Sequence, residues 1–202
     1  TAGDIMGKFA KAQQTDTPAF KSWFGDSKVV DANGNPLVVY HGTTAQEGFN
    51  KFGFDKNVEL ARNLGLNIDG RFFFAESADT ASSYANEGAG SVMPTYLSIK
   101  NPLIIDAKGN SYNHGYDSNA GTNGVVHEAV NKAIDEGHDG VIVRNVSDHV
   151  DSDIVSNQPT TTVFVAFKQD QIKSAIGNNG NFDPNNPDIR FNQVAPTNSE
   201  IA

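Results

Sequence analysis

Short apolar runs separated by turn residues constrain the fold of this chain more than any other feature. Most of these runs are rich in Val, Ile or Phe and are bounded by Gly, Asn, Asp or Pro, which is typical of short strands. Many short strands with a few small helices favour an α+β fold built on a split antiparallel sheet. We expect strands at residues 29–30, 37–40, 72–74, 96–99, 103–105, 141–143 and 163–167.

Short helices are expected between these strands. We expect one short amphipathic helix at residues 20–24, and Ser77 is a plausible N-cap for a helix over 79–85. An apolar stripe predicts a longer helix over 125–136, which ends before a glycine. Residues 57–66 also carry a helical pattern, within a segment that is otherwise irregular.

A length of 202 residues favours one domain with extensions at its ends. We interpret residues 1–17 as a leader or linker, 18–191 as the folded domain and 192–202 as a flexible tail. The chain starts with Thr1 rather than Met, so we expect it to be part of a longer polypeptide.

Composition narrows the classes of function. There are 24 acidic against 15 basic residues, a net charge of −9, which disfavours binding to nucleic acid through a broad basic face but leaves a local patch possible. With no cysteine, the chain has no disulfide, thiolate metal site or cysteine nucleophile, and its histidines lack the spacing of metal ligands. The chain contains no apolar run of about 18 residues, so no membrane span is predicted.

The tripeptide His41-Gly42-Thr43 is the most informative local motif. It ends the apolar run 36–40, so a strand is expected to deliver the histidine to the mouth of a cleft. The glycine leaves the backbone open to a ligand that lies close to it. Phe73 is expected to face away from its two phenylalanine neighbours, and Tyr84 follows eleven residues later.

With these residues in order, the chain resembles the His-Tyr-Glu group of ADP-ribosyltransferases, which includes diphtheria toxin and the poly(ADP-ribose) polymerases. The matching pieces are 41–43, then 71–75 followed by Tyr84, then the late strand 163–167 followed by Gln171. The chain also resembles the transferase domains of phage and mobile-element polyvalent proteins and of phage head-morphogenesis proteins. The motifs of that second resemblance lie at residues 20–25, 33–43, 72–74, 171–175 and 182–190.

The resemblance implies an ADP-ribosyltransferase-like split sheet that binds NAD⁺ as co-substrate, with no metal. It implies that His41 hydrogen-bonds a hydroxyl of the adenine-side ribose and that the backbone of Gly42 holds the nicotinamide carboxamide. Thr43 is expected to add a hydroxyl contact to ribose. Phe73 and Tyr84 are expected to form the two walls around the nicotinamide ring, and Arg71 is a candidate for the pyrophosphate.

Two positions depart from the family pattern. Phe73 stands where a tyrosine is usual, so the aromatic wall is kept without its hydroxyl. Val163 stands where the family glutamate is expected, and a valine can neither orient a ribose hydroxyl nor stabilise positive charge. Gln171 is one polar candidate to replace it. The other candidates precede the late strand: Asp151, Asp153, Gln158 and the threonines 160–162. Two alternatives stay open here: the target supplies the acid, or catalysis is weak.

The resemblance implies transfer of a single ADP-ribose to a macromolecular acceptor, because loss of the glutamate tends to accompany transfer of one unit. Given the acidic composition, we expect that acceptor to be a protein. The expected setting is a phage- or mobile-element-encoded effector or toxin acting in bacterial cytoplasm. Two alternatives remain at this point: an NAD⁺ glycohydrolase, and a non-catalytic module that binds NAD⁺ or ADP-ribose.

Overall fold

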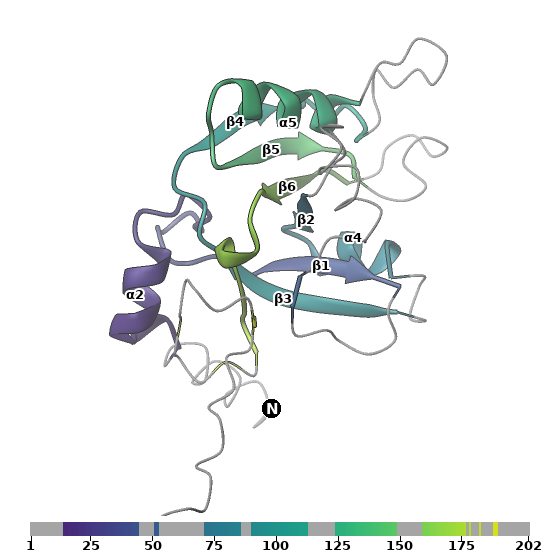
Figure 1. The fold of residues 1–202 in the computed structure, drawn as a ribbon. Coiled ribbons are helices and arrows are strands. Elements are labelled where there is room, and N and C mark those ends of the chain that lie inside the picture. The colour runs from purple at the N-terminus through teal and green to yellow at the C-terminus, as the bar shows by residue number, and fades with distance from the viewer. Residues whose placement is uncertain are drawn as a thin grey trace, which may run out of the picture.

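The computed structural model describes residues 14–44, 51–52, 71–85, 90–112, 124–148, 159–176, 178, 182 and 188–189. Within these ranges a β-sheet is flanked by short helices (Figure 1). The helices are α2 (Pro18–Phe24), α4 (Ala78–Ser83), α5 (Val125–Asp135) and the 3₁₀ turn η2 (Gln169–Gln171). The strands are β1 (Val39–Thr43), β2 (Phe72–Ala75), β3 (Ser91–Leu97), β4 (Pro102–Asp106), β5 (Gly140–Val146), β6 (Thr161–Ala166) and β7 (Ile172–Ser174).

The strands form one seven-stranded sheet in the order β4-β5-β6-β2-β1-β3-β7. The α+β expectation is met in its broad form, as a mixed sheet with few helices. The antiparallel prediction is wrong for one pair, because β4 and β5 run parallel. Between them the chain passes through α5, which lies beside both strands in Figure 1, and a crossover of this kind returns the chain in the same direction.

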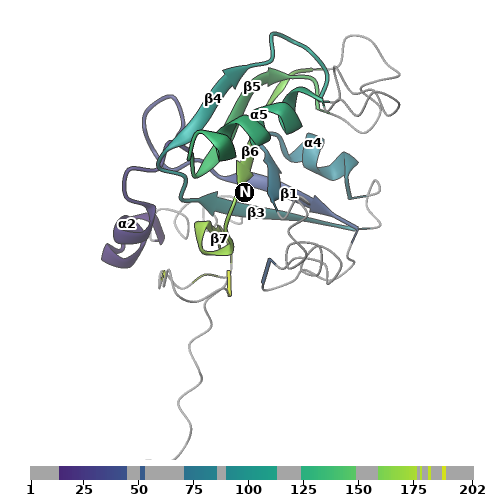
Figure 2. The ribbon, with the colours of Figure 1, turned by 45° about the horizontal axis from the view of Figure 1, so that its top comes forward.

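The two halves of the sheet meet at a narrow junction between β1 and β2. These strands share the single partner pair Tyr40–Ala75. By contrast, β2 pairs with β6 at four positions and β1 pairs with β3 at five. In Figures 1 and 2, α4 and α2 lie toward opposite ends of β1. The sheet is therefore continuous, but its centre is held by few backbone contacts.

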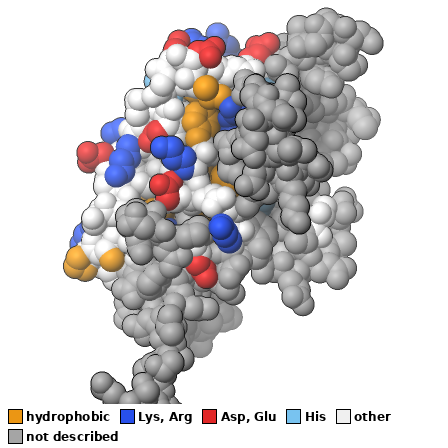
Figure 3. Space-filling view, viewed as in Figure 1, with side chains coloured by type: hydrophobic (Ala, Val, Ile, Leu, Met, Phe, Trp, Pro, Cys, Tyr) orange, Lys and Arg blue, Asp and Glu red, His pale blue; other side chains and the backbone are white. Residues whose placement is uncertain are grey.

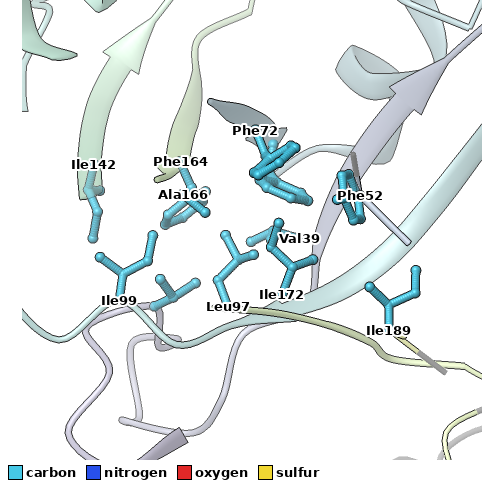
Figure 4. Close-up of a cluster of buried hydrophobic side chains, with 12 residues drawn as sticks. Val39, Phe52, Phe72, Leu97, Ile99, Ile142, Phe164, Ala166, Ile172 and Ile189 are labelled. Carbon is cyan, nitrogen blue, oxygen red and sulfur yellow. The ribbon is translucent and has the colours of Figure 1, made fainter. Parts of the chain in front are cut away.

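One face of the sheet carries a core to which strands from both halves contribute (Figure 4). Phe72 and Phe74 are both buried in it, as the alternation of a strand predicts, and Phe73 faces the opposite side. Phe52 and Ile189, which lie outside the sheet, complete this core. The other large side chains in it are Val29, Val39, Leu97, Ile99, Ile142, Phe164 and Ile172.

On the opposite face, α5 covers the part of the sheet formed by β4, β5 and β6. This helix buries one stripe of small apolar side chains against the valines of β5 and β6, as the 3.6-residue period of the sequence predicts. The side chains of this second core include Val126, Ala129, Val130, Ala133, Val141, Val143, Val163 and Val165.

Helix α2 packs against the half of the sheet that contains β3. Thr17 caps it by accepting a hydrogen bond from the backbone of Phe20, and its Trp23 donates a hydrogen bond from Nε1 to the Asp170 carbonyl at 2.8 Å. Phe20 packs edge-on against Tyr96, with their ring centroids 5.1 Å apart. The helix therefore joins the N-terminal part of the domain to β3 and η2.

Most helices and strands lie where the sequence predicts them, but several of their boundaries differ from the prediction. Ser77 caps α4 through a hydrogen bond from the Thr80 amide, as expected. β1 continues through Thr43, so the His-Gly-Thr motif lies within the strand rather than after it. The expected strand at 29–30 is reduced to one bridge. β7 was not expected at all, and the helical pattern at 57–66 lies outside the described residues.

We predict that Ile99→Ala lowers the free energy of unfolding by about 2–5 kcal/mol, because Ile99 is 0% exposed in the first core. Ile104→Ala is the matched control: its side chain is 46% exposed, and its loss should cost less than about 1 kcal/mol. Urea unfolding of both variants measures the difference. Equal losses would contradict the described core.

Candidate functional site

A pocket of about 220 Å³ opens beside the junction of β1 and β2. Residues from β1, β2 and α4 line it, together with two residues that follow β4 and β5. The lining residues are Tyr40, His41, Gly42, Phe73, Phe74, Ala75, Ala81, Tyr84, Tyr112 and Asp148.

The pocket receives residues from both faces of the sheet. Tyr40 pairs with Ala75, so their side chains share one face, and Gly42 and Phe73 follow on that face by alternation. His41 belongs to the opposite face. Because β1 and β2 have no further partner pair beyond the junction, residues of either face can reach the space between the strands.

His41 bridges this gap with its side chain. Its Nδ1 lies 2.8 Å from the carbonyl oxygen of Phe73, and since a carbonyl only accepts, Nδ1 carries the hydrogen. Burial lowers the pKa of His41 below its ordinary value of 6.5, against the smaller raising effect of this hydrogen bond. The imidazole is therefore neutral at pH 7, with Nε2 as an acceptor. Phe52 packs edge-on against the ring at 5.0 Å.

Gly42 permits a close approach of α4 to β1. A Cβ atom at this position would lie 1.8 Å from the carbonyl oxygen of Ala81 and 3.1 Å from Cβ of Tyr84. No side chain fits there unless α4 moves away. The glycine is therefore needed to bring Tyr84, the C-cap residue of α4, to the pocket.

The backbone of Gly42 faces the same gap. Pro94 is the β3 partner of Tyr40. Its carbonyl accepts a hydrogen bond from the Ala175 amide, on the side of β3 that faces away from β1. Tyr40 and Pro94 therefore form a non-hydrogen-bonded pair, and the amide and carbonyl of Tyr40 point toward β2. Gly42 lies two residues further along the strand, so its N–H and C=O point in that direction too.

Tyr84 and Asp148 form a hydrogen-bonded pair at the pocket wall. The Tyr84 hydroxyl donates to Oδ1 of Asp148 at 2.5 Å. Tyr84 is 40% exposed, whereas Asp148 is only 6% exposed. The pair therefore combines an accessible aromatic ring with a carboxylate that is largely shielded from solvent.

Tyr112 and Phe73 form an aromatic wall on another side. Their ring centroids are 6.2 Å apart, and His127 of α5 packs at right angles to Tyr112 at 5.6 Å. Burial, and secondarily the charge of Asp148, raise the pKa of Tyr112 above its ordinary value of 10. The Tyr112 phenol is thus neutral over the physiological pH range.

Four of the residues singled out in the sequence line this pocket: His41, Gly42, Phe73 and Tyr84. Thr43 is their neighbour in β1 but is not part of the lining. Arg71 is not part of it either, because its guanidinium lies over the Phe167 ring, 5.6 Å from the centroid.

Gln171 requires a correction, because the structure gives it a structural role. Its Oε1 accepts from the amides of Phe167 and Lys168, and its Nε2 donates to the carbonyls of Ser98 and Asp139. It lies beyond the end of β6, whereas the pocket adjoins the start of that strand. Gln171 therefore stabilises the turn after β6 and lies outside the pocket lining, where a replacement for the family glutamate was expected.

The other candidates for that role do not enter the pocket lining. Val163 is 1% exposed and packs in the core under α5. Thr161 is buried, and Thr160 and Thr162 do not line the pocket. Residues 151–158, which include the remaining candidates, lie outside the described part of the chain.

Sequence reasoning missed Asp148 and Tyr112. A strand, a helix and a second strand at 103–105, 125–136 and 141–143 form a pattern that predicts a parallel pair, with both carboxyl ends at one edge. Both missed residues follow such ends: Ser111 and Ser147, next to them in sequence, form a parallel bridge. Treating the three elements as one unit would have drawn attention to both residues.

Three further features of the described residues bear on the class of site. They contain no group of three or more His, Cys, Asp or Glu side chains that could hold a metal ion. Among the helices in the described ranges, none is long and apolar enough to cross a membrane. In Figure 3, the described part of the visible face carries Lys and Arg side chains interspersed with Asp and Glu.

Comparison with known proteins identifies the family. Residues 31–182 match the family model described as ADP-ribosyltransferase in polyvalent proteins. The chain therefore belongs to this family of ADP-ribosyltransferases, enzymes that use NAD⁺ as substrate. No curated protein and no solved structure matches the chain.

We predict that Val163→Glu, which places the family glutamate at position 163, destabilises the folded protein. The side chain of Val163→Glu would enter the core under α5, and an unpaired buried charge costs about 3–5 kcal/mol. Val163→Met is the control, with similar bulk and no charge. Thermal unfolding compares them; a glutamate variant as stable as the methionine variant would show that this position faces solvent or the pocket.

Proposed function

We propose that this protein transfers a single ADP-ribose unit from NAD⁺ to a macromolecular acceptor and releases nicotinamide, with a site of the His-Tyr-Glu type. The observation that carries the proposal is the convergence of His41, Gly42, Phe73 and Tyr84 in one pocket. These residues come from β1, β2 and the end of α4. The family match supports the same reaction class.

The size and lining of the pocket suit one aromatic ring rather than a whole dinucleotide. Its volume of about 220 Å³ is below the ~300–1,000 Å³ of typical small-molecule sites. Phe73 and Tyr84 offer aromatic surfaces, and offset stacking on a ring adds about 0.5–1.5 kcal/mol beyond area burial. We assign the nicotinamide end of NAD⁺ to this pocket, and the rest of the molecule would extend from its mouth.

The polar groups at the β1–β2 gap match further groups of NAD⁺. The N–H and C=O of Gly42 point toward the gap and would hold the carboxamide, which needs one donor and one acceptor. The neutral imidazole of His41 would accept a hydrogen bond from a ribose hydroxyl through Nε2, because its Nδ1–H is committed to Phe73.

In the reaction, the bond between the ribose anomeric carbon and the nicotinamide nitrogen breaks, and its electron pair neutralises the departing pyridinium. The acceptor atom forms the new bond to that carbon and loses a proton. Positive charge builds up on the ribose in the transition state, so groups that orient the ribose and counter this charge accelerate the step. Transfer of one unit rather than a chain is motivated by valine at position 163.

We propose a protein as the acceptor and bacterial cytoplasm as the place of action. The net charge of −9 disfavours nucleic acid as a partner held by phosphate contacts. The family name refers to polyvalent proteins, which fits an effector or toxin encoded by a phage or mobile element.

Labelled NAD⁺ incubated with the protein and a bacterial lysate tests the proposal. Label attached to macromolecules, removed by protease and not by nuclease, is the expected result. Label that accumulates as free ADP-ribose would favour a glycohydrolase instead. Binding of NAD⁺ without nicotinamide release would favour a non-catalytic module, for which valine at 163 is the motivating observation.

We predict that His41→Ala lowers kcat/KM for NAD⁺ at least about 100-fold, since it removes a ribose contact and the link between β1 and β2. His138→Ala is the control, because His138 contacts Asn101 and Glu136 away from the pocket. The measured quantity is nicotinamide release. A His41→Ala rate within a few-fold of wild type would contradict the site.

We predict that NAD⁺ affinity falls on acidification. Protonation of His41 removes the Nε2 acceptor, and because its pKa is lowered, affinity should stay constant at neutral pH and fall only below about pH 6.5. The same shift makes the folded state lose stability as pH falls, since the unfolded state then binds more protons. Titration calorimetry at a series of pH values measures the affinity for NAD⁺, with His41→Gln as control. Affinity that rises on acidification would contradict this role.

A further inference from the structure

We infer that Asp148 supplies the carboxylate of this active site, by contacting the ribose that carries nicotinamide when NAD⁺ is bound. This inference rests on the proposed function. It gives the role of the expected glutamate to a residue of a different strand, because the side chain at position 163 is a valine enclosed in the core under α5.

The backbone before Asp148 is built irregularly at the point where β5 approaches the pocket. Val143 faces Val163 and Val146 faces Thr161, so β5 has one residue more than β6 between these pairs. Asn145, inside this bulge, adopts the left-handed conformation with φ of 54°, which is uncommon for a residue other than glycine. Bulges of this kind redirect a strand and occur often beside active sites.

The segment after β4 then holds the end of β5 in place. The Ser147 amide donates to the Asn110 carbonyl at 2.9 Å, and the Tyr112 amide donates to the Ser147 carbonyl at 2.9 Å. Asn145 also donates from Nδ2 to Asp106 at 3.0 Å. The backbone directly before Asp148 is thus held by two hydrogen bonds of Ser147 to the segment after β4, which favours a precisely oriented carboxylate.

Asp148 is the one carboxylate among the described residues that line the pocket. It is only 6% exposed, and aspartate is seldom buried to this degree without a partner or a function. The Asp148 carboxylate accepts a hydrogen bond from Tyr84, which fixes the orientation of the group. A carboxylate accepts several hydrogen bonds at once, so a contact with a ribose hydroxyl is compatible with the bond from Tyr84.

The electrostatics of the site suit the charge that develops on ribose. Tyr112 stays a neutral phenol beside Asp148, so it adds no second negative charge to the pocket. A single negative charge in a shielded site interacts with a nearby positive charge much more strongly than it would in water. Asp148 is therefore placed to stabilise the transition state more than the ground state, which is the condition for catalysis.

The test compares Asp148→Asn with Tyr84→Phe, using NAD⁺ and lysate proteins as acceptors. Asp148→Asn keeps the shape and removes the charge, so we expect kcat for nicotinamide release to fall at least about 100-fold, with KM changed less than about threefold. Tyr84→Phe keeps the ring and removes the bond to Asp148, and should cost less than about tenfold. Asp135→Asn, an exposed acid on α5, should behave as wild type.

The double variant separates catalysis from positioning. If Asp148 contacts ribose, adding Asp148→Asn to Tyr84→Phe lowers kcat by at least a further factor of about ten. If Asp148 only holds Tyr84, the double variant equals Tyr84→Phe, and the inference is overturned. An Asp148→Asn rate within about threefold of wild type overturns it as well. Should Asp148→Asn unfold, Asp148→Ser removes the same charge and gives the same comparison.

The failures of the two proposals differ in their results. Wild-type protein that releases no nicotinamide contradicts the proposed function, and with it the role of Asp148. Wild-type turnover that survives the loss of the Asp148 charge contradicts the role of Asp148 alone.

Discussion

The hydrogen bond from His41 to the Phe73 carbonyl is the interaction on which the site depends. The bond lies where the pairing of β1 and β2 ends after one residue pair. There a bond between a side chain and a backbone carbonyl links the two strands in place of backbone–backbone hydrogen bonds. The gap stays open to a ligand while its two edges remain tied. The same bond fixes which nitrogen of His41 carries the hydrogen, so one contact sets the geometry and the chemistry of the histidine.

Close packing around this gap explains why the motif needs glycine after histidine. Gly42 lets α4 lie against β1, and Tyr84, at the end of α4, thereby reaches the pocket lining beside Gly42. On the far side, the bulge in β5 brings Asp148 to the hydroxyl of Tyr84. Three separate backbone features thus shape this pocket: the β1–β2 junction, the close contact at Gly42 and the bulge in β5.

The sequence predicted the parts of the fold that local physics determines. The alternation of Phe72, Phe73 and Phe74 and the cap at Ser77 follow from periodicity and side-chain chemistry, and both are confirmed. β7 was missed because it is short and contains Lys173, a fully buried lysine whose Nζ donates to the Asp188 carbonyl.

The errors at the site arose from contacts between distant segments. Gln171 has a polar side chain near the right strand, but its four hydrogen bonds to backbone groups cannot be inferred from its neighbours in sequence. Asp148 depends on an extra residue in β5 and on pairing with the segment after β4. Spacing along the chain could therefore predict four residues that line the pocket, the histidine, the glycine and the aromatic pair, but not Asp148.

A crystal structure of the protein with nicotinamide or NAD⁺ bound would show whether the pocket holds the pyridine ring. We expect the ring between Phe73 and Tyr84, with its carboxamide on the backbone N–H and C=O of Gly42. A ring bound elsewhere on the molecule, or a complex in which these side chains do not touch it, would rule out this site.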